Sequence, residues 1–324
     1  MNQRFSSIPA FVKPCIIVHV IIKFPSSEIT NALLVTGASS EIGGALIRQL
    51  LNNAGLKIRA MVHRSLVNVP DCEIRLGDLK NSGLLTRALS GVDTVVHMAA
   101  LTKSTSELDY FETNVNGTEN LIDACLKNGV KKIIYISSSA ASLNGGGYSR
   151  SKLEAEQCIK RSGMKWVIIR PSEVYGQRVG DSINRLIHWI QNYTFVPVIG
   201  AGKCKLSPVF IDDVVSAIAL SIFNQELENQ TIVLAGPEEL TYDELVDRVA
   251  LYFGVKRFKL HLPAGLVKFI ATVMSGLGIN TLAPDQIPRL LCEKSFGIDL
   301  AREKLDYSPR SLEEGIRNSI TYDD

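Results

Sequence analysis

Tyr148 and Lys152 stand four residues apart, a spacing that puts two side chains on the same face of a helix. A phenol beside an ammonium group is a candidate acid–base pair, because the nearby positive charge favours the phenolate. The pair predicts a tyrosine pKa lowered from about 10. Such a side chain could pass a proton to or from a substrate oxygen. Because the same spacing is common on ordinary helix surfaces, the surrounding elements decide whether the pair is catalytic.

The residues before Tyr148 predict a buried strand that ends in hydroxyl groups. Residues 133–136 are apolar, residues 137–139 are three serines, and the glycine run 145–147 precedes a segment with helical spacing. A strand that ends here would bring Ser138 and Ser139 to the edge of a sheet, close to Tyr148. This context favours a catalytic pair over a chance surface match.

An earlier strand–turn–helix unit begins at residue 32. Apolar residues 32–35 are followed by Thr36-Gly37-Ala38-Ser39-Ser40-Glu41-Ile42-Gly43 and then by an amphipathic segment that ends at Leu51. A tight glycine turn before a helix presents free backbone N–H groups and the positive end of the helix dipole to a phosphate. The placement of this turn after the first strand predicts a dinucleotide-binding site.

The end of the next predicted strand, 57–62, bears on the choice of dinucleotide. Folds that bind NAD often carry an acidic residue about 20 residues after the glycines, whereas this chain has His63 and Arg64 there. An arginine can pair with a 2′-phosphate. We therefore favour NADP over NAD as the cofactor. The alternative is that Arg64 is a solvated loop charge.

The rest of the chain repeats the alternation of strands and helices. Further strands are predicted at 72–76, 94–98, 166–169 and 232–234, with a long helix over 106–127. This pattern predicts an α/β fold, a Rossmann-like doubly wound parallel sheet with a smaller C-terminal substrate-binding region. We assign residues 31–178 to the NAD(P)-binding domain, with 206–236 returning to it, residues 179–205 and 237–324 to the substrate-binding region, and residues 1–30 to a loosely ordered N-terminal extension.

The composition is that of an ordinary globular protein. The chain has 324 residues, 46% of them hydrophobic, and a formal net charge of +2 with mixed signs, so nothing favours a nucleic-acid partner. Its six cysteines contain no C-x-x-C pair, which favours reduced thiols in the cytoplasm over disulfides or a metal site. The apolar stretch 11–24 is shorter than the about 20 residues that span a bilayer, so we predict no transmembrane span.

Several short motifs are informative as an ordered set. They are the turn 36–43, Gly77-Asp78-Leu79, Val96-His97-Met98-Ala99-Ala100, Asn114-Val115-Asn116-Gly117-Thr118, the serine-ended strand, Tyr148-x-x-x-Lys152, Arg170-Pro171 and residues 208–214. Their order and spacing resemble the extended short-chain dehydrogenase/reductase family, which includes NAD-dependent epimerases and dehydratases of nucleotide sugars. The resemblance covers nearly everything after residue 31.

The resemblance implies a role for each matched residue. Tyr148 would be the acid/base, Lys152 would hold the nicotinamide ribose, and Ser139 would hydrogen-bond the substrate oxygen, with Ser138 as its substitute if the register differs by one. The dinucleotide would contact Gly37, Ser39, Ser40, Ile42, Gly43, His63, Arg64, Asp78, Leu79, Ala99, Ala100, Leu101, Asn114, Tyr148, Lys152, Pro171 and Val174. The substrate would contact Thr102, Ser138, Glu173 and Lys205.

The function implied by the resemblance is an NAD(P)-dependent epimerase or dehydratase of a nucleotide sugar, acting as a homodimer. Two departures weaken the substrate assignment: Glu173 stands where such enzymes often carry Asn, and Leu206 stands where an Arg commonly holds the diphosphate. A net dehydrogenase or ketoreductase of a hydrophobic, sterol-like secondary alcohol is the alternative. A non-catalytic cofactor-binding assembly subunit is a third hypothesis, which the retention of Tyr148 and Lys152 disfavours.

The segment 263–279 carries a single charged residue, Lys268. We expect a buried or lid-like helix that partly covers the site. A membrane contact or a dimer face is the alternative explanation for such an apolar stretch.

Overall fold

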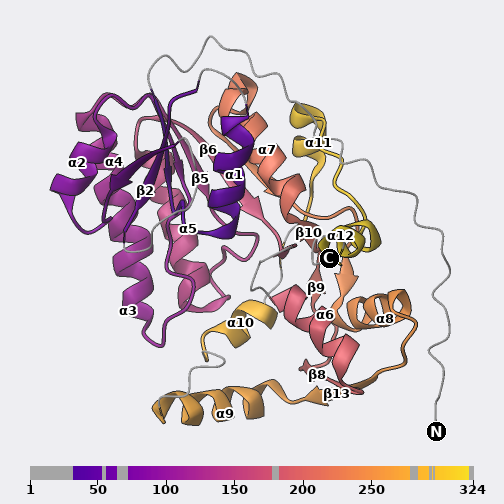
Figure 1. The fold of residues 1–324 in the computed structure, drawn as a ribbon. Coiled ribbons are helices and arrows are strands. Elements are labelled where there is room, and N and C mark those ends of the chain that lie inside the picture. Colours follow the sequence, from indigo (N-terminus) through magenta and orange to yellow (C-terminus); the bar gives the residue numbers. More distant parts are fainter. Residues whose placement is uncertain are drawn as a thin grey trace, which may run out of the picture.

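A seven-stranded sheet lies at the centre of the molecule (Figure 1). The computed structural model describes residues 32–52, 56–63, 72–176, 182–277, 284–291, 294 and 296–320. In spatial order the strands are β11 (Gln230–Leu234), β6 (Lys165–Pro171), β5 (Lys132–Ile136), β4 (Thr94–His97), β1 (Leu33–Thr36), β2 (Ile58–Val62) and β3 (Glu73–Leu76). All neighbours run parallel. The strand order reverses between β1 and β4, so the predicted doubly wound, Rossmann-like fold is confirmed.

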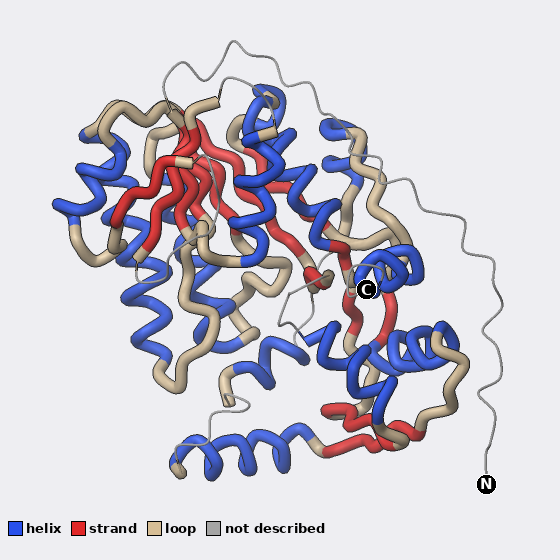
Figure 2. The backbone as a smooth tube through the Cα atoms, in the orientation of Figure 1, coloured by secondary structure: helices blue, strands red, loops and turns tan. Residues whose placement is uncertain are grey.

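Helices cover both faces of this sheet (Figure 2). The helices α1 (Glu41–Leu51) and α7 (Ile211–Phe223) pack together on one face, and the other carries α2 (Ser82–Leu89), α4 (Gly117–Lys127) and α5 (Gly146–Arg161). Successive residues of a strand point to opposite faces. In β1, Leu33 and Val35 accordingly belong to one hydrophobic cluster and Leu34 to the other. Burial on both faces explains why the strands are apolar runs rather than alternating ones.

The predicted helix over 106–127 is three consecutive helical segments. α3 (Glu107–Tyr110) passes into a π-helical turn, η1 (Phe111–Asn116), which passes into α4. A π-helical turn places one extra residue in the helix and changes which side chains face the sheet. The hydrophobic spacing contains no signal for this turn, since the flanking apolar positions still repeat at helical intervals.

The C-terminal region packs beside the carboxyl ends of the strands. The remaining elements after β6 are β7 (Val174–Tyr175), α6 (Ser182–Asn192), β8 (Phe195–Ile199), β9 (Lys205–Leu206), β10 (Val209–Phe210), η2 (Gln225–Leu227), β12 (Leu240–Thr241), α8 (Tyr242–Tyr252), β13 (Phe258–Leu262), α9 (Ala264–Gly276), α10 (Gln286–Leu291), α11 (Asp299–Leu305) and α12 (Leu312–Ile320). The short strands pair as β7 with β10, β9 with β12 and β8 with β13. None of the helices in the described residues is long and apolar enough to cross a membrane.

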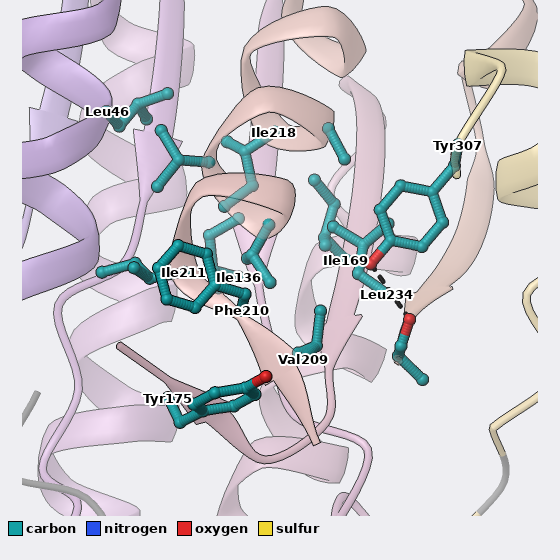
Figure 3. Packing of buried hydrophobic residues seen from close by; sticks show 14 of the residues in the cluster. Leu46, Ile136, Ile169, Tyr175, Val209, Phe210, Ile211, Ile218, Leu234 and Tyr307 are labelled. Atoms are coloured by element: carbon teal, nitrogen blue, oxygen red, sulfur yellow. Dashed lines mark hydrogen bonds between the residues drawn. The ribbon is translucent and has the colours of Figure 1, made fainter. Parts of the chain in front are cut away.

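Three tyrosine and phenylalanine rings join this region to the sheet (Figure 3). The ring of Tyr175 meets that of Phe210 edge-on, with 5.7 Å between centroids. The hydroxyl of Tyr307 donates to the carbonyl of Ala235 at 3.0 Å, and that of Tyr175 donates to the carbonyl of Leu312 at 3.2 Å. Buried hydroxyls with partners fix the position of α11 and α12 against β11 and β7.

The expectation of a buried helix over 263–279 is wrong for its described part. Of the α9 side chains only that of Ala271 is buried, while Phe269 is 67% exposed. The helix lies along the lower edge of the molecule in Figure 1, next to the β8–β13 pair. The apolar composition of this helix therefore does not come from packing in the core.

Candidate active site

The turn between β1 and α1 has the geometry of a phosphate-binding turn. Gly37 has a φ of +67°, and a Cβ atom there would lie 2.7 Å from the backbone N of Ala99, so only glycine fits. The side chain of Ser40 caps α1: its Oγ accepts from the N–H of Gly43 at 3.0 Å and donates to the carbonyl of Gly37 at 2.8 Å. The Ser40 hydroxyl is thus committed to the turn itself.

A cavity of about 550 Å³ opens beside this turn. Of the residues predicted to bind the dinucleotide, its lining includes Gly37, Ser39, Ser40, His63, Asp78, Leu79, Ala99, Ala100 and Leu101, and it adds Met61, Gly77, Lys80, Met98 and Thr113. The lining combines the ends of β1, β2, β3 and β4. This is the crevice at the point where the strand order reverses, where doubly wound sheets bind ligands.

A buried histidine holds one wall of this cavity. The Oγ1 of Thr36 accepts from the N–H groups of Met98 and Ala99, both at 3.1 Å, so its own hydrogen is directed to Nδ1 of His97 at 2.7 Å. The Nε2 of His97 then donates to Thr118 Oγ1 at 3.0 Å. Burial lowers the pKa of His97 to about 3, which keeps the ring neutral. His97 is therefore a structural residue of the cavity wall.

Asn114 supports the same loop without lining the cavity. Its side chain accepts from the N–H of Leu101 at 2.7 Å and donates to the carbonyl of Leu101 at 3.0 Å. It also donates to Ser151 Oγ at 3.0 Å, which ties the loop to α5. Asn114 was predicted as a cofactor contact. In the structure it holds the backbone of Leu101, which lines the first cavity.

The far end of the cavity carries the residues that bear on the choice of dinucleotide. His63 Nε2 lies 3.4 Å from the Asp78 carboxylate, and both side chains line the cavity. Arg64 lies outside the described residues. Asp78 is fixed in part by accepting from the N–H of Lys80 at 2.9 Å. A carboxylate is thus present at this end, although it comes from the segment after β3 rather than from the end of β2.

Tyr148 is buried between two other side chains. The guanidinium carbon of Arg289 lies 4.7 Å from the centroid of the Tyr148 ring, and the ring of Tyr110 meets it edge-on at 6.1 Å. Burial raises the pKa of Tyr148, against a smaller lowering by Arg289 and by a hydrogen bond with Ser138. The predicted lowering of this pKa by Lys152 is wrong here, since burial dominates and Arg289 is the cation that acts on the phenol.

Ser138 rather than Ser139 is the serine beside the phenol. Ser138 lowers the pKa of Tyr148, and its half-buried Oγ accepts from the N–H of Ala140 at 3.2 Å. The backbone N–H of Ser139 donates to the carbonyl of Pro171 at 2.8 Å, and Ser139 continues the main-chain connection to β6. Ser138, which we named as the substitute, is thus the serine that acts on the phenol, and its contact with a substrate stays a prediction.

Lys152 lies deeper in the fold than Tyr148. Its Nζ donates to the carbonyl of Ile136 at 2.8 Å and sits 4.1 Å from the centroid of the Tyr135 ring. Burial lowers the pKa of Lys152 to about 7, against a smaller raising by Glu156. At neutral pH the amine is therefore poised between its charged and neutral forms.

The buried amine predicts a pH dependence of stability. The pKa of Lys152 is about 7 in the folded chain and about 10.4 in the unfolded chain, so between these values the unfolded state binds more protons. The free energy of unfolding should therefore rise with pH above 7, by at most about 1.4 kcal/mol per pH unit from this group. Urea unfolding of the wild type and of Lys152→Met at pH 7 and pH 9, without added dinucleotide, measures the difference. An identical pH dependence of the free energy of unfolding in both proteins would contradict the lowered pKa of Lys152.

The N-terminus of α5 is capped by a residue far away in the sequence. Asp285, just before α10, accepts from the N–H of Gly147 at 2.6 Å and from that of Tyr148 at 3.4 Å. A Cβ at Gly146, whose φ is +87°, would lie 2.6 Å from Oδ1 of Asp285. The glycine run thus lets a carboxylate approach the start of the helix that carries Tyr148.

Removing this cap should weaken both the fold and the site. Asp285→Ala is expected to lower the free energy of unfolding by about 1 kcal/mol, the usual effect of losing a helix cap. Asp285→Asn keeps an oxygen acceptor and should lose less than half of that. Thermal unfolding of the two variants is the measurement, and equal losses would show that the capping hydrogen bonds do not stabilise α5.

A second cavity, of about 420 Å³, lies between α6, β8 and α10. Its lining is mainly apolar and consists of Glu173, Ile183, Arg185, Leu186, Trp189, Val196, Pro197, Ile199, Gly202, Cys204, Leu206, Tyr242, Leu262, Val267, Leu290, Leu291 and Lys294. The Glu173 carboxylate forms an ion pair with Lys294 and accepts from the N–H of Ser207 at 3.4 Å. The helix α10 connects this cavity to the phenol, because Arg289 faces Tyr148 while the next two residues, Leu290 and Leu291, line the second cavity.

Several predicted site residues lie elsewhere. Ile42, Gly43, Pro171 and Val174 are in or next to the right elements but are not part of either cavity lining. Lys205 is exposed and pairs with Glu239 at 3.3 Å. The carbonyl of Thr102 accepts from Arg289 at 3.4 Å, while the residue itself is exposed. The structure therefore does not bring Lys205 to the second cavity.

Three residues near the site were missed by the sequence analysis: Asp285, Arg289 and Lys294. Each acts on a residue more than a hundred positions away, namely Gly147, Tyr148 and Glu173. A signal for Lys294 was available, since a carboxylate at position 173 needs a cation once it is partly buried. No local pattern marks Asp285 or Arg289.

Comparison with known protein families gives one broad match. The sequence model described as the NAD dependent epimerase/dehydratase family matches residues 33–236. The matched segment begins at β1 and ends just after β11, so it contains the complete parallel sheet, the first cavity and Tyr148.

Two characterised relatives illustrate the range of proteins that this chain is similar to. The N-acetyl-alpha-D-glucosaminyl-diphospho-ditrans,octacis-undecaprenol 4-epimerase of Escherichia coli O157:H7 is 29% identical over 255 residues, which cover 72% of this chain and 75% of that protein. The 3beta-hydroxysteroid-dehydrogenase/decarboxylase isoform 1 of Arabidopsis thaliana is 27% identical over 285 residues, which cover 75% of this chain and 65% of the plant protein.

Solved structures agree with the fold. The structure of MoeE5 in complex with UDP-glucose and NAD superimposes with a TM-score of 0.71 at 24% identity, covering 90% of this chain and 98% of that one. At this identity the likeness concerns the arrangement of the elements.

Proposed function

Because the chain belongs to the NAD dependent epimerase/dehydratase family, we propose that it transfers a hydride between a nicotinamide dinucleotide and a carbinol carbon of a sugar, with Tyr148 as acid/base. The observation that carries this proposal is the position of the phenol. Tyr148 lies on α5, where Ser138 and Arg289 both lower its pKa, beside the sheet edge whose crevice holds the first cavity. A hydroxyl or ketone oxygen bound there would meet two hydroxyl groups at once.

The first cavity fits a dinucleotide on physical grounds. The left-handed Gly37 leaves a space that any Cβ would fill, and the N-terminus of α1 directs backbone N–H groups and a positive dipole end toward it. A bound nicotinamide would supply or accept the hydride. The turn 37–40 would bind the pyrophosphate, and the segment 99–101, held by Thr36 and Asn114, would position the dinucleotide along the sheet edge.

The residues around the phenol have separable tasks in this proposal. Tyr148 gives a proton to the substrate oxygen when a ketone is reduced and takes it back when an alcohol is oxidised. Ser138 holds that oxygen, and Arg289 favours the phenolate that appears during turnover. Lys152, one turn further along the same face of α5, binds the nicotinamide ribose, as the family resemblance implies.

The sugar is proposed to be carried on a diphosphate, as in a nucleotide sugar. This rests on the family and on the relatives, one of which is named as an epimerase of a diphospho-linked sugar. In an epimerase the hydride returns to the same carbon from the other side, so the dinucleotide shows no net change. A homodimer is part of the same proposal by resemblance.

A second candidate is a net dehydrogenase or ketoreductase that acts on a hydrophobic secondary alcohol. One specific observation favours it: the second cavity presents aliphatic and aromatic side chains, with Leu206 buried in its wall and the Glu173 carboxylate neutralised by Lys294. An apolar group gains about 25 cal/mol for each Å² that such a wall removes from water. A diphosphate at this wall would have to compete with Glu173 for Lys294.

A turnover assay separates the two candidates. The purified chain is incubated with UDP-hexoses or with 3β-hydroxysteroids and a stoichiometric amount of dinucleotide, while absorbance at the NAD(P)H band and the product mixture are followed. Conversion of one hexose to its epimer without an absorbance change supports the first candidate. A stoichiometric absorbance change with a steroid supports the dehydrogenase or ketoreductase and contradicts the epimerase.

A binding experiment measures which dinucleotide the chain prefers. We propose NADP, because His63 and Arg64 directly follow β2 at the place where an NAD-binding fold often carries an acidic residue. Fluorescence titration with NADPH and NADH gives the two dissociation constants. A lower constant for NADH would reverse this assignment and make Asp78 the candidate partner of the ribose hydroxyls.

A further inference from the structure

The helix α9 presents three different faces. Its exposed apolar residues Leu266, Phe269, Ile270, Val273 and Leu277 recur at intervals of three and four residues, so they form one stripe. Val267, Ala271 and Met274, which are buried or half-buried, form the face toward the body of the protein. Lys268, Thr272 and Ser275 lie on the third, polar face.

The β8–β13 pair continues the exposed apolar stripe. In this parallel pair Phe258 is matched with Phe195 and Leu260 with Pro197, and matched residues point to the same face. Phe195 and Phe258 are 62% and 63% exposed, and their ring centroids lie 5.9 Å apart. Two residues further along the same face, Leu262 and Ile199 line the second cavity.

An apolar track therefore leads from the surface into the second cavity. It begins at the exposed aromatic pair, passes Leu260 and Pro197, and ends at Leu262 and Ile199 inside. Val267 of α9 lines the cavity as well, so the helix adjoins this entrance. Exposed apolar surface of this extent, next to an apolar cavity, marks a contact site rather than ordinary surface.

Charge identifies the kind of partner. Between Asp247 and Asp285 the chain has no Asp or Glu. Lys259 is paired with Asp247 at 2.7 Å, and the Arg257 guanidinium donates to the carbonyls of Ile190 and Gln191. The exposed Lys256 and Lys268 therefore supply the positive charge that faces outward. A short helix with an apolar stripe, a small polar face and only basic charges is typical of helices that lie in the interface of an anionic bilayer. α9 is too short to span a bilayer, which agrees with a position parallel to the surface.

We propose that α9 and the exposed end of the β8–β13 pair dock onto the surface of a membrane that contains anionic lipids, and that this docking places the mouth of the second cavity at the lipid. The stripe 266–277 and the rings of Phe195 and Phe258 enter the interfacial layer, and Lys256 and Lys268 bind the headgroups. This inference concerns the surface alone and holds whichever substrate the active site takes.

The test is flotation of the full chain with vesicles of phosphatidylcholine, with and without phosphatidylglycerol. The wild type should float with the mixed vesicles, and much less with phosphatidylcholine alone or in high salt. Phe269→Asn should lower the partition coefficient about tenfold, because one aromatic side chain no longer leaves water. Thr272→Asn, on the polar face of the same helix, is the matched control and should float like the wild type.

Three results would overturn the proposal. One is absence of flotation with any vesicle. Another is flotation that Phe269→Asn leaves unchanged, which would assign membrane binding to a different part of the chain. The third is self-association of the wild type in size-exclusion chromatography that Phe269→Asn abolishes, since the stripe would then be covered by a second copy. Circular dichroism and thermal unfolding of both variants establish that they are folded, as expected for changes at exposed positions.

Discussion

Replacing Tyr148 with phenylalanine is expected to lower the turnover number by about 10²- to 10⁴-fold, the usual contribution of a positioned acid/base. The ring stays, so the contacts with Arg289 and Tyr110 are kept and only the hydroxyl beside Ser138 is lost. Dinucleotide affinity should change by less than about threefold, because Tyr148 does not line the first cavity. Steady-state kinetics at saturating dinucleotide, combined with a fluorescence titration, measure both quantities.

Tyr135→Phe is the matched control for this experiment. Tyr135 is another fully buried tyrosine near Lys152, and its hydroxyl has no hydrogen-bond partner within the described residues. Removing a buried hydroxyl without a partner costs nothing in stability, and turnover should stay within a factor of about three. If Tyr148→Phe behaved like Tyr135→Phe, the acid/base assignment would be wrong.

Glu156→Leu is expected to destabilise the fold by about 3–5 kcal/mol, since it leaves a partly buried cation without its partner. Glu156 is fully buried, and its carboxylate accepts from Arg170 at 2.8 Å and 2.6 Å and from Ser137 Oγ at 2.5 Å. This network joins α5 to β5 and β6 directly behind the site. Urea unfolding gives the change in the free energy of unfolding, and the midpoint should fall strongly at an unchanged slope.

An exposed ion pair on the same helix provides the comparison. Glu154 lies 3.5 Å from Arg161, and both side chains are largely exposed, so Glu154→Gln should cost less than about 0.5 kcal/mol. The double variant Glu156→Leu with Arg170→Met removes both buried charges and should recover part of the loss. If the double variant were as unstable as the sum of the two single variants, the ion pair would not be the source of the effect.

The fold could be predicted from the sequence because each strand and helix carries its own local signal. The apolar runs at 32–35, 133–136 and 166–169 are strands of the sheet, and the turn at Gly37 lies where the glycine pattern puts it. The π-helical turn at 111–116 was not predictable, because one extra residue in a helix leaves the spacing of its neighbours intact. The exposure of α9 was not predictable either, since an apolar helix can lie in a core, at an interface or in a membrane surface.

The candidate site also has features that the sequence predicts and features that it does not. Ser39, Asp78 and Ala99 were predicted from the family resemblance, and they line the first cavity because each follows a strand and parallel strands end at one edge. The pKa of Tyr148 was predicted in the wrong direction, because four-residue spacing shows a neighbouring charge but not the depth of burial that opposes it. The homodimer and the cytoplasmic location stay predictions.

The contact between Asp285 and the start of α5 has a consequence for the order in which the protein matures. The two partners are 138 positions apart, so a chain emerging from the ribosome completes its sheet and its first cavity long before Asp285 and Arg289 are synthesised. Under the proposed function, a dinucleotide would therefore bind to, and stabilise, a chain that is not yet able to catalyse. Activity would begin only after the later part of the chain had folded back over Tyr148.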